Sequence, residues 1–389
     1  MRRIVLMRGA WLVAAVVALM GVVAATRGGA EGDQATQPIA HTATTPVTLP
    51  AGMAPAWSPD GLDAAARDLP RLHSLLVSRD GEIVFERYYN GMRRDRPANV
   101  KSASKSIISA LVGIAIDRRL IPDVATPIVK YFPELASDSD SRKREITVEH
   151  LLTMRPGLEG TSNRNYGAWV TSRNWVRHAL ARPMFASPGE EMEYSTGNTH
   201  LLSAILTKAS GKSTWQFASE VLAKPLGFAL AQWPRDPQGI YFGGNDMLLT
   251  PRQMLAFGEL YLNEGRANRH QLVSTDWVER SCDGRARNRR PGGPGFDSNR
   301  ESDPLRDREY GYAWWVHEIR GYETCFAWGY GGQYIFVMPE LELVMVTTSS
   351  PDVSEERRGH RRLLFDILDE FVVTPISASR NSRPDAFTN

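Results

Sequence analysis

The distribution of strand-like segments most constrains how this chain can fold. Runs rich in β-branched and aromatic residues occur early, at 75–85, and late, at 312–347. The residues between them have mainly helical patterns interrupted by Pro and Gly. The simplest arrangement joins both strand regions in one antiparallel sheet with helices packed on it. We therefore predict an α+β fold with a mostly helical middle lobe at about 126–245, and a site in the cleft between lobe and sheet.

Local patterns predict the individual elements. Asp80-Gly81 is a strong signal for a two-residue hairpin turn between the early strands 75–77 and 83–85. The late strands are expected at 312–316, 324–328, 333–338 and 341–347. The main helices are expected at 58–69, 102–119, 198–210, 251–263 and 354–372.

The segments outside this folded part have a different amino-acid composition. Residues 1–25 combine early arginines with an uncharged apolar run, which is typical of a signal peptide or a membrane anchor, and the short run favours the cleaved signal. Residues 26–57 are rich in Gly, Ala, Thr and Pro and predict a flexible linker. The folded domain is then 58–375, and 376–389 is predicted to be a disordered tail. We expect an exported protein, periplasmic or secreted, with membrane attachment if the segment is retained.

Composition excludes several classes of function. The net charge of +2 offers no electrostatic case for binding nucleic acid. The eight histidines are scattered and suggest no metal site, so we predict no metal and no cofactor. The two cysteines, Cys282 and Cys325, either form one disulfide in an exported protein or remain two buried thiols. An arginine-, glycine- and proline-rich stretch at 283–308 predicts a mobile surface loop.

Ser102 and Lys105 are the first candidate catalytic residues. They are three positions apart at the start of an apolar helix, so both side chains share one face. A serine hydroxyl becomes a nucleophile when an adjacent base removes its proton, and a lysine can do so once its surroundings favour the neutral amine. The pair alone has the competing interpretation of a helix cap beside an exposed lysine. No Gly-x-Ser-x-Gly motif is present, which argues against an α/β-hydrolase.

Several further motifs occur in order along the chain, and together with the Ser102 helix they resemble the β-lactamase-related serine hydrolases. That superfamily includes class C β-lactamases, penicillin-binding DD-peptidases, esterases and 6-aminohexanoate-dimer hydrolases. The resemblance covers about 60–372. The matching segments are 102–117, 146–158, 188–198, 245–251 and 329–340.

The resemblance implies a catalytic role for Tyr194, whose phenolate near the lysine could take the serine proton and pass it to the leaving group. The competing interpretation is a buried aromatic side chain. The family motif is Tyr-x-Asn, whereas this chain has Thr196 at the third position. Asn198 is the nearest substitute for the missing substrate-binding asparagine.

The resemblance also implies that Ala327-Trp328-Gly329 replaces the Lys-Thr-Gly triplet that holds a substrate carboxylate in β-lactamases and DD-peptidases. A clamp for a carboxylate is then absent, unless an arginine reaches in from a loop. Backbone N–H groups of Ser102 and Tyr330 can still form an oxyanion hole. Trp328, Gly329 and Gly331 are expected to contact substrate. The competing interpretation of the glycines is a twisted strand with a glycine bulge, which gives the same sequence pattern.

These residues together predict an exported serine hydrolase that cleaves an ester or amide bond of a small molecule through an acyl-enzyme on Ser102. A β-lactamase or DD-peptidase ranks below it because the triplet has no lysine. A non-catalytic penicillin-binding-like envelope protein is the alternative from another class. The sequence does not indicate an oligomeric state.

Overall fold

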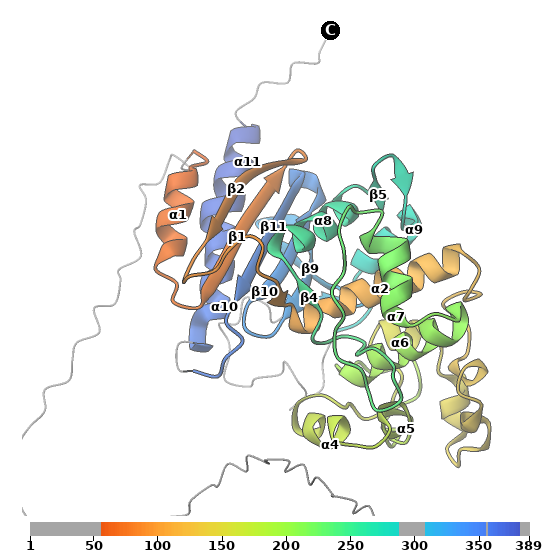
Figure 1. Cartoon of the computed structure of the whole chain (residues 1–389). Helices are drawn as coiled ribbons and strands as arrows, with labels where there is room; N and C mark the ends of the chain where they lie inside the picture. Colours follow the sequence, from red (N-terminus) through yellow and green to blue (C-terminus); the bar gives the residue numbers. More distant parts are fainter. Residues whose placement is uncertain (1–55, 288–307, 355–356, 382–389) are drawn as a thin grey trace, which may run out of the picture. The chain divides into compact units, whose positions relative to one another are not determined.

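The computed structural model describes residues 56–287, 308–354 and 357–381 (Figure 1). The predicted signal or anchor, nearly all of the predicted linker, most of the predicted loop at 283–308 and the last eight residues lie outside these ranges. Within them, no helix combines the length and the hydropathy that a membrane span requires.

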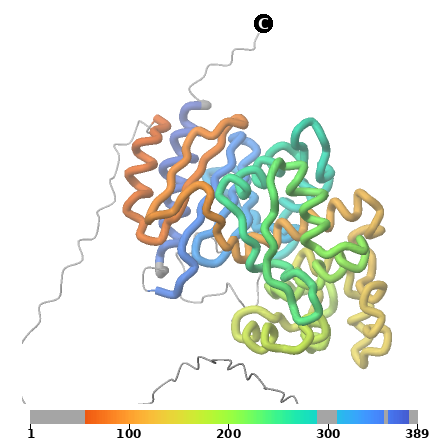
Figure 2. Tube along the Cα trace, in the orientation of Figure 1, coloured from red at the N-terminus to blue at the C-terminus, as the bar shows by residue number. Residues whose placement is uncertain are grey.

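One seven-stranded antiparallel sheet forms the centre of the domain, in the order β2-β1-β11-β10-β9-β8-β7. Early and late segments meet where β1 pairs with β11, for example at Leu76 and Val346, so the orange hairpin lies beside the blue strands (Figures 1 and 2). This pairing confirms the predicted α+β fold. The strands are β1 Leu72–Arg79, β2 Glu82–Tyr88, β7 Glu309–Tyr310, β8 Trp315–Ile319, β9 Tyr322–Gly329, β10 Gln333–Met338 and β11 Leu343–Ser349.

The hairpin turns follow local backbone preferences. Asp80 and Gly81 both have positive φ, at 51° and 78°, as a tight turn between twisted strands requires. The strand predicted at 312–316 is wrong in its first half. Tyr310 pairs with Trp315, and the N–H of Gly311 bonds the carbonyl of Trp314 across a turn in which Ala313 has φ +60°. Residue propensities do not predict this turn, because the run is rich in aromatic residues and the residue with positive φ is an alanine rather than a glycine.

One face of the sheet is covered by the first and last helices of the described chain (Figure 1). Ser58 caps helix α1, Pro59–Arg67, as its sequence predicts. Helix α10, Arg357–Asp366, continues through a π-helical turn into α11, Thr374–Asn381. Ile376 of α11 is 1% exposed in the same apolar cluster as α1, so the prediction that a disordered tail begins at 376 is wrong: burial of an apolar side chain extends the helix by another turn.

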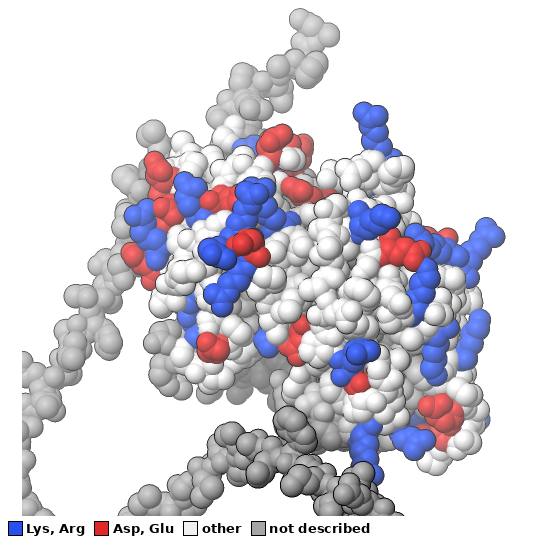
Figure 3. Space-filling model, in the orientation of Figure 1, with Lys and Arg blue, Asp and Glu red and all other residues white. Residues whose placement is uncertain are grey.

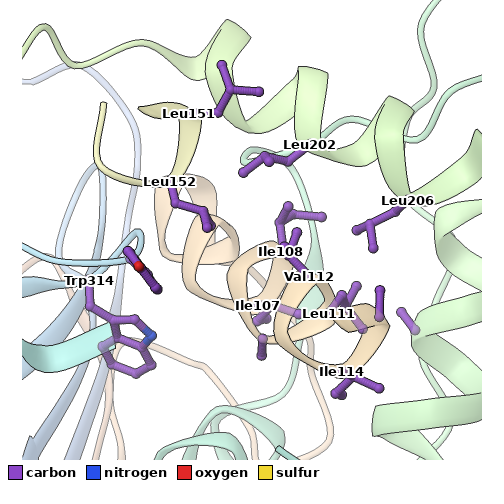
Figure 4. Packing of buried hydrophobic residues seen from close by; sticks show 14 of the residues in the cluster. Ile107, Ile108, Leu111, Val112, Ile114, Leu151, Leu152, Leu202, Leu206 and Trp314 are labelled. Carbon is purple, nitrogen blue, oxygen red and sulfur yellow. The ribbon is translucent and has the colours of Figure 1, made fainter. Parts of the chain in front are cut away.

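The opposite face is covered by α8, Pro251–Leu262, and by α2, Ser104–Asp117. A Cβ at Gly258 would lie 2.5 Å from Cγ1 of Val344, so the glycine allows α8 to approach the sheet. Helix α2 lies between the sheet and the middle lobe, and every residue from Ser104 to Ala115 is buried. Figure 4 shows its apolar side chains packed against leucines from the middle lobe on one side, with Trp314 on the sheet side.

The middle lobe is helical, as predicted. Its longest helix, α6 Thr196–Ser210, starts two residues earlier than expected and ends at Gly211, which adopts φ +68°. The other α-helices of the described lobe are α3 Val148–Leu152, α4 Tyr166–Val170, α5 Trp175–Leu180 and α7 Thr214–Ala218. Helix α9, Thr275–Cys282, follows the lobe. Two short ladders complete the list, β3 Ala98–Asn99 with β4 Leu248–Leu249, and β5 Arg266–Ala267 with β6 His270–Gln271.

A disulfide joins Cys282, at the end of α9, to Cys325 in β9. It resolves the alternative that the sequence left open. Lys and Arg are interspersed with Asp and Glu on the described surface that Figure 3 shows.

Candidate active site

Ser102 is positioned by a backbone ladder. Strand β3 pairs with β4, and the amide of Val100 continues the ladder by donating to the carbonyl of Met247 at 2.9 Å. Lys101 then takes φ +50° and turns the chain into a 3₁₀ turn, Lys101–Ala103, that leads into α2. Ser102 therefore lies one short turn before the helix on which the sequence placed it.

Lys105 is buried beneath Ser102. Its Nζ lies 3.0 Å from Oγ of Ser102 and 2.6 Å from the carbonyl oxygen of Gly244. The side chain is 1% exposed. Burial lowers the pKa of Lys105 to about 7, against a smaller opposing effect of the Asp246 carboxylate. An amine with this pKa can accept a proton from the serine near neutral pH.

Tyr194 completes the predicted group of three. Its ring stacks on Trp315 at a centroid distance of 5.8 Å, and Nζ of Lys105 lies 5.0 Å from its centroid. Burial raises the pKa of Tyr194 well above its usual range, although a hydrogen bond with the Ser102 side chain and the charge of Arg308 act in the opposite direction. The phenol is therefore neutral at neutral pH. Of the two groups, Lys105 is therefore better suited to be the base than the Tyr194 phenolate that the resemblance implies, and Tyr194 is suited to donate a proton.

Helix α6 holds the loop that binds Lys105. Thr199 donates from Oγ1 to the carbonyl of Gly243, and Ser203 donates to the carbonyl of Tyr241. The amide of Gly243 donates to Nδ1 of His200 at 3.3 Å. The Nε2 of His200 lies 3.0 Å from the Asp236 carboxylate.

Because Nδ1 of His200 accepts a hydrogen bond, Nε2 carries the proton and donates to Asp236. Burial holds the pKa of His200 below its usual value, which keeps this tautomer neutral, while the hydrogen bond with Asp236 acts in the opposite direction. Both side chains are fully buried. The His200–Asp236 pair therefore supports the Gly243–Gly244 backbone, and neither residue lines the cleft.

A carboxylate ties the other side of the same loop to the nucleophile. Oδ1 of Asp246 accepts from Nδ2 of Asn99 at 2.7 Å and from Nζ of Lys101 at 3.2 Å. These two contacts connect Asp246 to residues that directly precede Ser102 in the chain.

Two of the three candidate residues, Ser102 and Tyr194, line a cleft of about 700 Å³. Lys105 is not a lining residue and lies beneath Ser102. The other lining residues are Lys101, Ser162, Asn163, Tyr166, Thr196, Asn245, Arg308, Trp315, Trp328, Tyr330, Pro351 and Arg361. Most of the surfaces are polar side chains and aromatic rings, as in a site for a small organic molecule.

The end of β9 lies against the backbone that precedes Ser102. A Cβ at Gly329 would lie 2.1 Å from the carbonyl oxygen of Val100, so only glycine allows this approach. The approach brings Trp328 and Tyr330 to the cleft, where Tyr330 is 40% exposed. Gly329 and Gly331 are not among the lining residues of the cleft, and they pack against the backbone of Val100 and Pro351. Their contact with substrate stays a prediction.

The structure does not place Asn198 at the cleft. Its Nδ2 points to Sδ of Met154 at 3.5 Å, and the side chain is buried. Since α6 begins at Thr196, Asn198 lies two residues further round the helix and faces away. Thr196 lines the cleft instead, with its hydroxyl 3.0 Å from Oγ of Ser162.

Several polar residues of the cleft were not predicted as site residues, among them an amide, a phenol and two arginines. Nδ2 of Asn245 donates to the phenol oxygen of Tyr166 at 2.8 Å, so an amide and a phenol face the cleft near Ser102. Arg308 comes from the end of the predicted surface loop, and Arg361 comes from α10. Asn245 lies in a segment that the resemblance covered. The sequence analysis allowed for an arginine from a loop, but no motif identified Arg308 or Arg361.

No group of three His, Cys, Asp or Glu side chains that could hold a metal ion occurs in the part of the chain that the structure describes. The chemistry of the cleft is that of hydroxyls, an amine, amides and guanidinium groups.

Comparisons with known proteins identify the family and the fold. The model of the Beta-lactamase family matches residues 64–369. The 6-aminohexanoate-dimer hydrolase of Paenarthrobacter ureafaciens is 27% identical over 323 residues, which cover 77% of this chain and 80% of that protein. Two solved structures have the same fold. EstCE1, described as a hydrolase with promiscuous acyltransferase activity, has a TM-score of 0.62 at 18% identity and covers 80% of this chain and 97% of its own.

The octameric penicillin-binding protein homologue of Pyrococcus abyssi has a TM-score of 0.56 at 18% identity, over 80% of this chain and 77% of its own. The family match spans most of the domain and includes the Ser102, Tyr194 and Tyr330 segments. The chain therefore belongs to the beta-lactamase family and is a hydrolase with the beta-lactamase fold.

Proposed function

We propose that this protein is a serine hydrolase that cleaves an ester or amide bond of a small molecule through an acyl-enzyme on Ser102. One observation carries the proposal: Nζ of Lys105, with a pKa of about 7, lies 3.0 Å from Oγ of Ser102 at the floor of a cleft. A nucleophile and a base within hydrogen-bond reach are the minimum that covalent catalysis requires.

In this mechanism, neutral Lys105 takes the hydroxyl proton of Ser102 as Oγ attacks the substrate carbonyl. The backbone N–H groups of Ser102 and Tyr330 are the proposed donors to the oxyanion. Tyr194 gives its phenol proton to the leaving alcohol or amine and regains one from the Lys105 ammonium. Water then attacks the acyl-enzyme, its proton returns to Ser102 through the same groups, and the carboxylic acid leaves.

The choice between amide and ester belongs to the proposal. The resemblance to a 6-aminohexanoate-dimer hydrolase supports an amide, and the fold shared with EstCE1 is compatible with an ester. Ala327-Trp328-Gly329 has no lysine, which ranks a β-lactamase or DD-peptidase lower. Faster turnover of a chromogenic cephalosporin than of simple esters and amides would reverse this ranking.

We also propose that the protein is exported. The arginine-flanked apolar segment at 1–25 supports export. The disulfide between Cys282 and Cys325 supports an oxidising compartment.

A fluorophosphonate probe tests the acyl-enzyme. We expect covalent labelling of the wild-type protein and none of the Ser102→Ala variant, with the mass increase on the peptide that contains Ser102. Ser104→Ala is the matched control, because Ser104 donates to the carbonyl of Lys101 and is buried away from the cleft. Equal labelling of wild type and Ser102→Ala, or none of the wild type, would favour the non-catalytic envelope protein.

A further inference from the structure

The turn between β9 and β10 carries Tyr330, whose N–H is a proposed donor to the oxyanion. The amide of Gly332 closes this turn by donating to the carbonyl of Gly329 at 3.3 Å. Gly331 and Gly332 both have positive φ, at 96° and 113°. Glycine restricts its own backbone little, so the position of the Tyr330 amide depends on what holds the turn from outside.

The backbone ladder between β10 and β11 ends before it reaches this turn, at the pair Tyr334 and Thr347. Beyond that pair, side chains of β11 replace the ladder. Oγ1 of Thr347 donates to the carbonyl of Gly332 at 2.9 Å, and Oγ of Ser349 donates to the same oxygen at 3.3 Å. Nε2 of Gln333 donates to the carbonyl of Ser349 at 2.5 Å. Side-chain hydrogen bonds therefore fix the turn to β11.

His360 connects helix α10 to this network. Its Nε2 lies 2.9 Å from Oγ of Ser349, and the residue is 3% exposed. Because Ser349 gives its only hydroxyl hydrogen to the carbonyl of Gly332, Nε2 of His360 is the donor in this contact. A Cβ at Gly332 would lie 3.1 Å from Nε2 of His360 and 2.9 Å from Cδ1 of Leu364, so α10 packs directly against the turn.

We propose that His360 is a positioning residue for the oxyanion hole. Through Ser349 it holds the carbonyl of Gly332, and with it the turn that presents the proposed donor, the N–H of Tyr330. This inference rests on the proposed function, since it assigns a role in the same reaction. His360 is not among the lining residues of the cleft, so it acts through the backbone and not on the substrate. A fixed backbone matters here because an oxyanion donor stabilises the transition state most when it needs no reorientation.

Two substitutions at His360 test the proposal. His360→Leu fills most of the same volume without a donor, whereas His360→Gln keeps an N–H close to the position of Nε2. The first readout is the plateau of kcat/KM for p-nitrophenyl acetate above pH 8, where Lys105 is neutral. We expect His360→Leu to lower this plateau about tenfold, which is less than the roughly 10²- to 10³-fold cost of removing a whole oxyanion donor. His360→Gln should recover most of the loss, and an equal loss in both variants would contradict the role of the N–H.

The pH profile distinguishes this role from a general disturbance of the site. Since the inferred effect is on the oxyanion and not on the base, the apparent pKa of the profile should stay at about 7 in both variants. A shifted apparent pKa would place the effect on Lys105 and overturn the proposal. His73→Leu is the matched control, because His73 is a partly buried histidine of β1 whose charge affects the pKa of His360. It should keep the plateau.

A double variant tests the link through Ser349. Ser349→Ala should lower the plateau as His360→Leu does, and the Ser349→Ala/His360→Leu double variant should lose no more than the larger single loss, because both residues act through one carbonyl. Losses that multiply would overturn the proposed link. If His360→Leu does not fold, Ser349→Ala removes the same link through a smaller change and takes its place in each comparison.

Amide exchange separates this inference from the proposed function. Hydrogen–deuterium exchange of the peptide that contains residues 329–333 should be faster in His360→Leu than in wild type, and His360→Gln should restore it. Equal exchange in wild type and His360→Leu, or faster exchange with an unchanged plateau, would overturn the proposal even if the wild type is an active hydrolase. Faster exchange in a protein that fluorophosphonate does not label would retain the role of His360 in holding the turn and reject the hydrolase.

Discussion

Nζ of Lys105 lies 2.6 Å from the carbonyl oxygen of Gly244, closer than it lies to the hydroxyl of Ser102. A Cβ at Gly244 would lie 2.7 Å from Cγ of Lys105, so the absence of a side chain is what allows this contact. The carbonyl fixes the amine under the serine without adding a full negative charge, and burial can therefore lower the pKa of Lys105.

The first prediction concerns pH. Because burial sets the pKa of Lys105 at about 7, the neutral amine is lost as the pH falls below that value. We expect kcat/KM for a neutral p-nitrophenyl ester to rise with pH and to level off above an apparent pKa of about 7. Lys105→Arg keeps the charge but remains protonated at all these pH values, so it should lose about 10³-fold or more. A flat profile from pH 5 to 8, or an active arginine variant, would contradict the role of base.

The second prediction separates the role of Tyr194 from that of its ring. Tyr194→Phe keeps the stacking on Trp315 and removes only the phenol, so folding should be unaffected. We expect hydrolysis of alkyl esters and amides to fall about 10²- to 10³-fold, since these leaving groups need a proton. Activated p-nitrophenyl esters should be less affected, because p-nitrophenolate leaves without one. An equal loss for both classes would mean that Tyr194 does not protonate the leaving group.

The third prediction concerns the buried pair behind the Lys105 loop. His200→Phe should reduce the free energy of unfolding by about 3 kcal/mol, because it leaves the Asp236 carboxylate without its buried partner. Adding Asp236→Asn should recover part of this loss, since burying a neutral amide without the histidine costs less free energy than burying a carboxylate without it. Chemical denaturation measures both. His270→Phe is the exposed control, and a loss as large there would rule out the specific contribution of the pair.

The fourth prediction is a pH-dependent loss of stability centred on His360. Burial, with smaller effects of Arg71 and His73, lowers the pKa of His360 to about 4, and its Nε2 lies 2.9 Å from Oγ of Ser349. The unfolded chain binds a proton below pH 6.5 that the folded protein does not bind until about pH 4. Stability is therefore lost as the pH falls through this window, by about 3 kcal/mol in total.

Wild type and His360→Gln compared by denaturation at pH 7 and pH 4.5 isolate this contribution, since the other titrating groups are common to both. The variant should lose less stability on acidification. An identical decrease in the two proteins would show that His360 does not contribute to it.

The fifth prediction concerns the disulfide, which closes a loop with a sequence separation of 43. Restriction of the unfolded chain by a loop of this length contributes about 2–4 kcal/mol. Cys282→Ser/Cys325→Ser should therefore unfold at lower denaturant concentration while fluorophosphonate labelling is retained, because neither cysteine lines the cleft. Unchanged stability, or loss of labelling in the folded double variant, would contradict this assignment.

Local patterns predicted the elements that depend on neighbouring residues. The Asp80-Gly81 turn, the cap at Ser58 and the end of α6 at Gly211 follow from backbone preferences over a few positions. The spacing of Ser102 and Lys105 likewise needs only helical geometry to bring the two side chains together. The pairing of early with late strands followed from the order of the elements.

Long-range packing determined the features that local sequence patterns could not predict. The start of α6 at Thr196 turned Asn198 away from the cleft, and the turn at Ala313 divided a run of aromatic residues. Arg308 and Arg361 have no motif, and they share one wall of the cleft because β7 and α10 are brought to Trp328 by the sheet. The sequence by itself thus determined that the candidate nucleophile Ser102 lies next to its candidate base Lys105, and it determined the arrangement of strands and helices. Only the tertiary structure decided which distant side chains line the cleft, because burial and charge at that cleft are properties of the packed chain and not of any local segment.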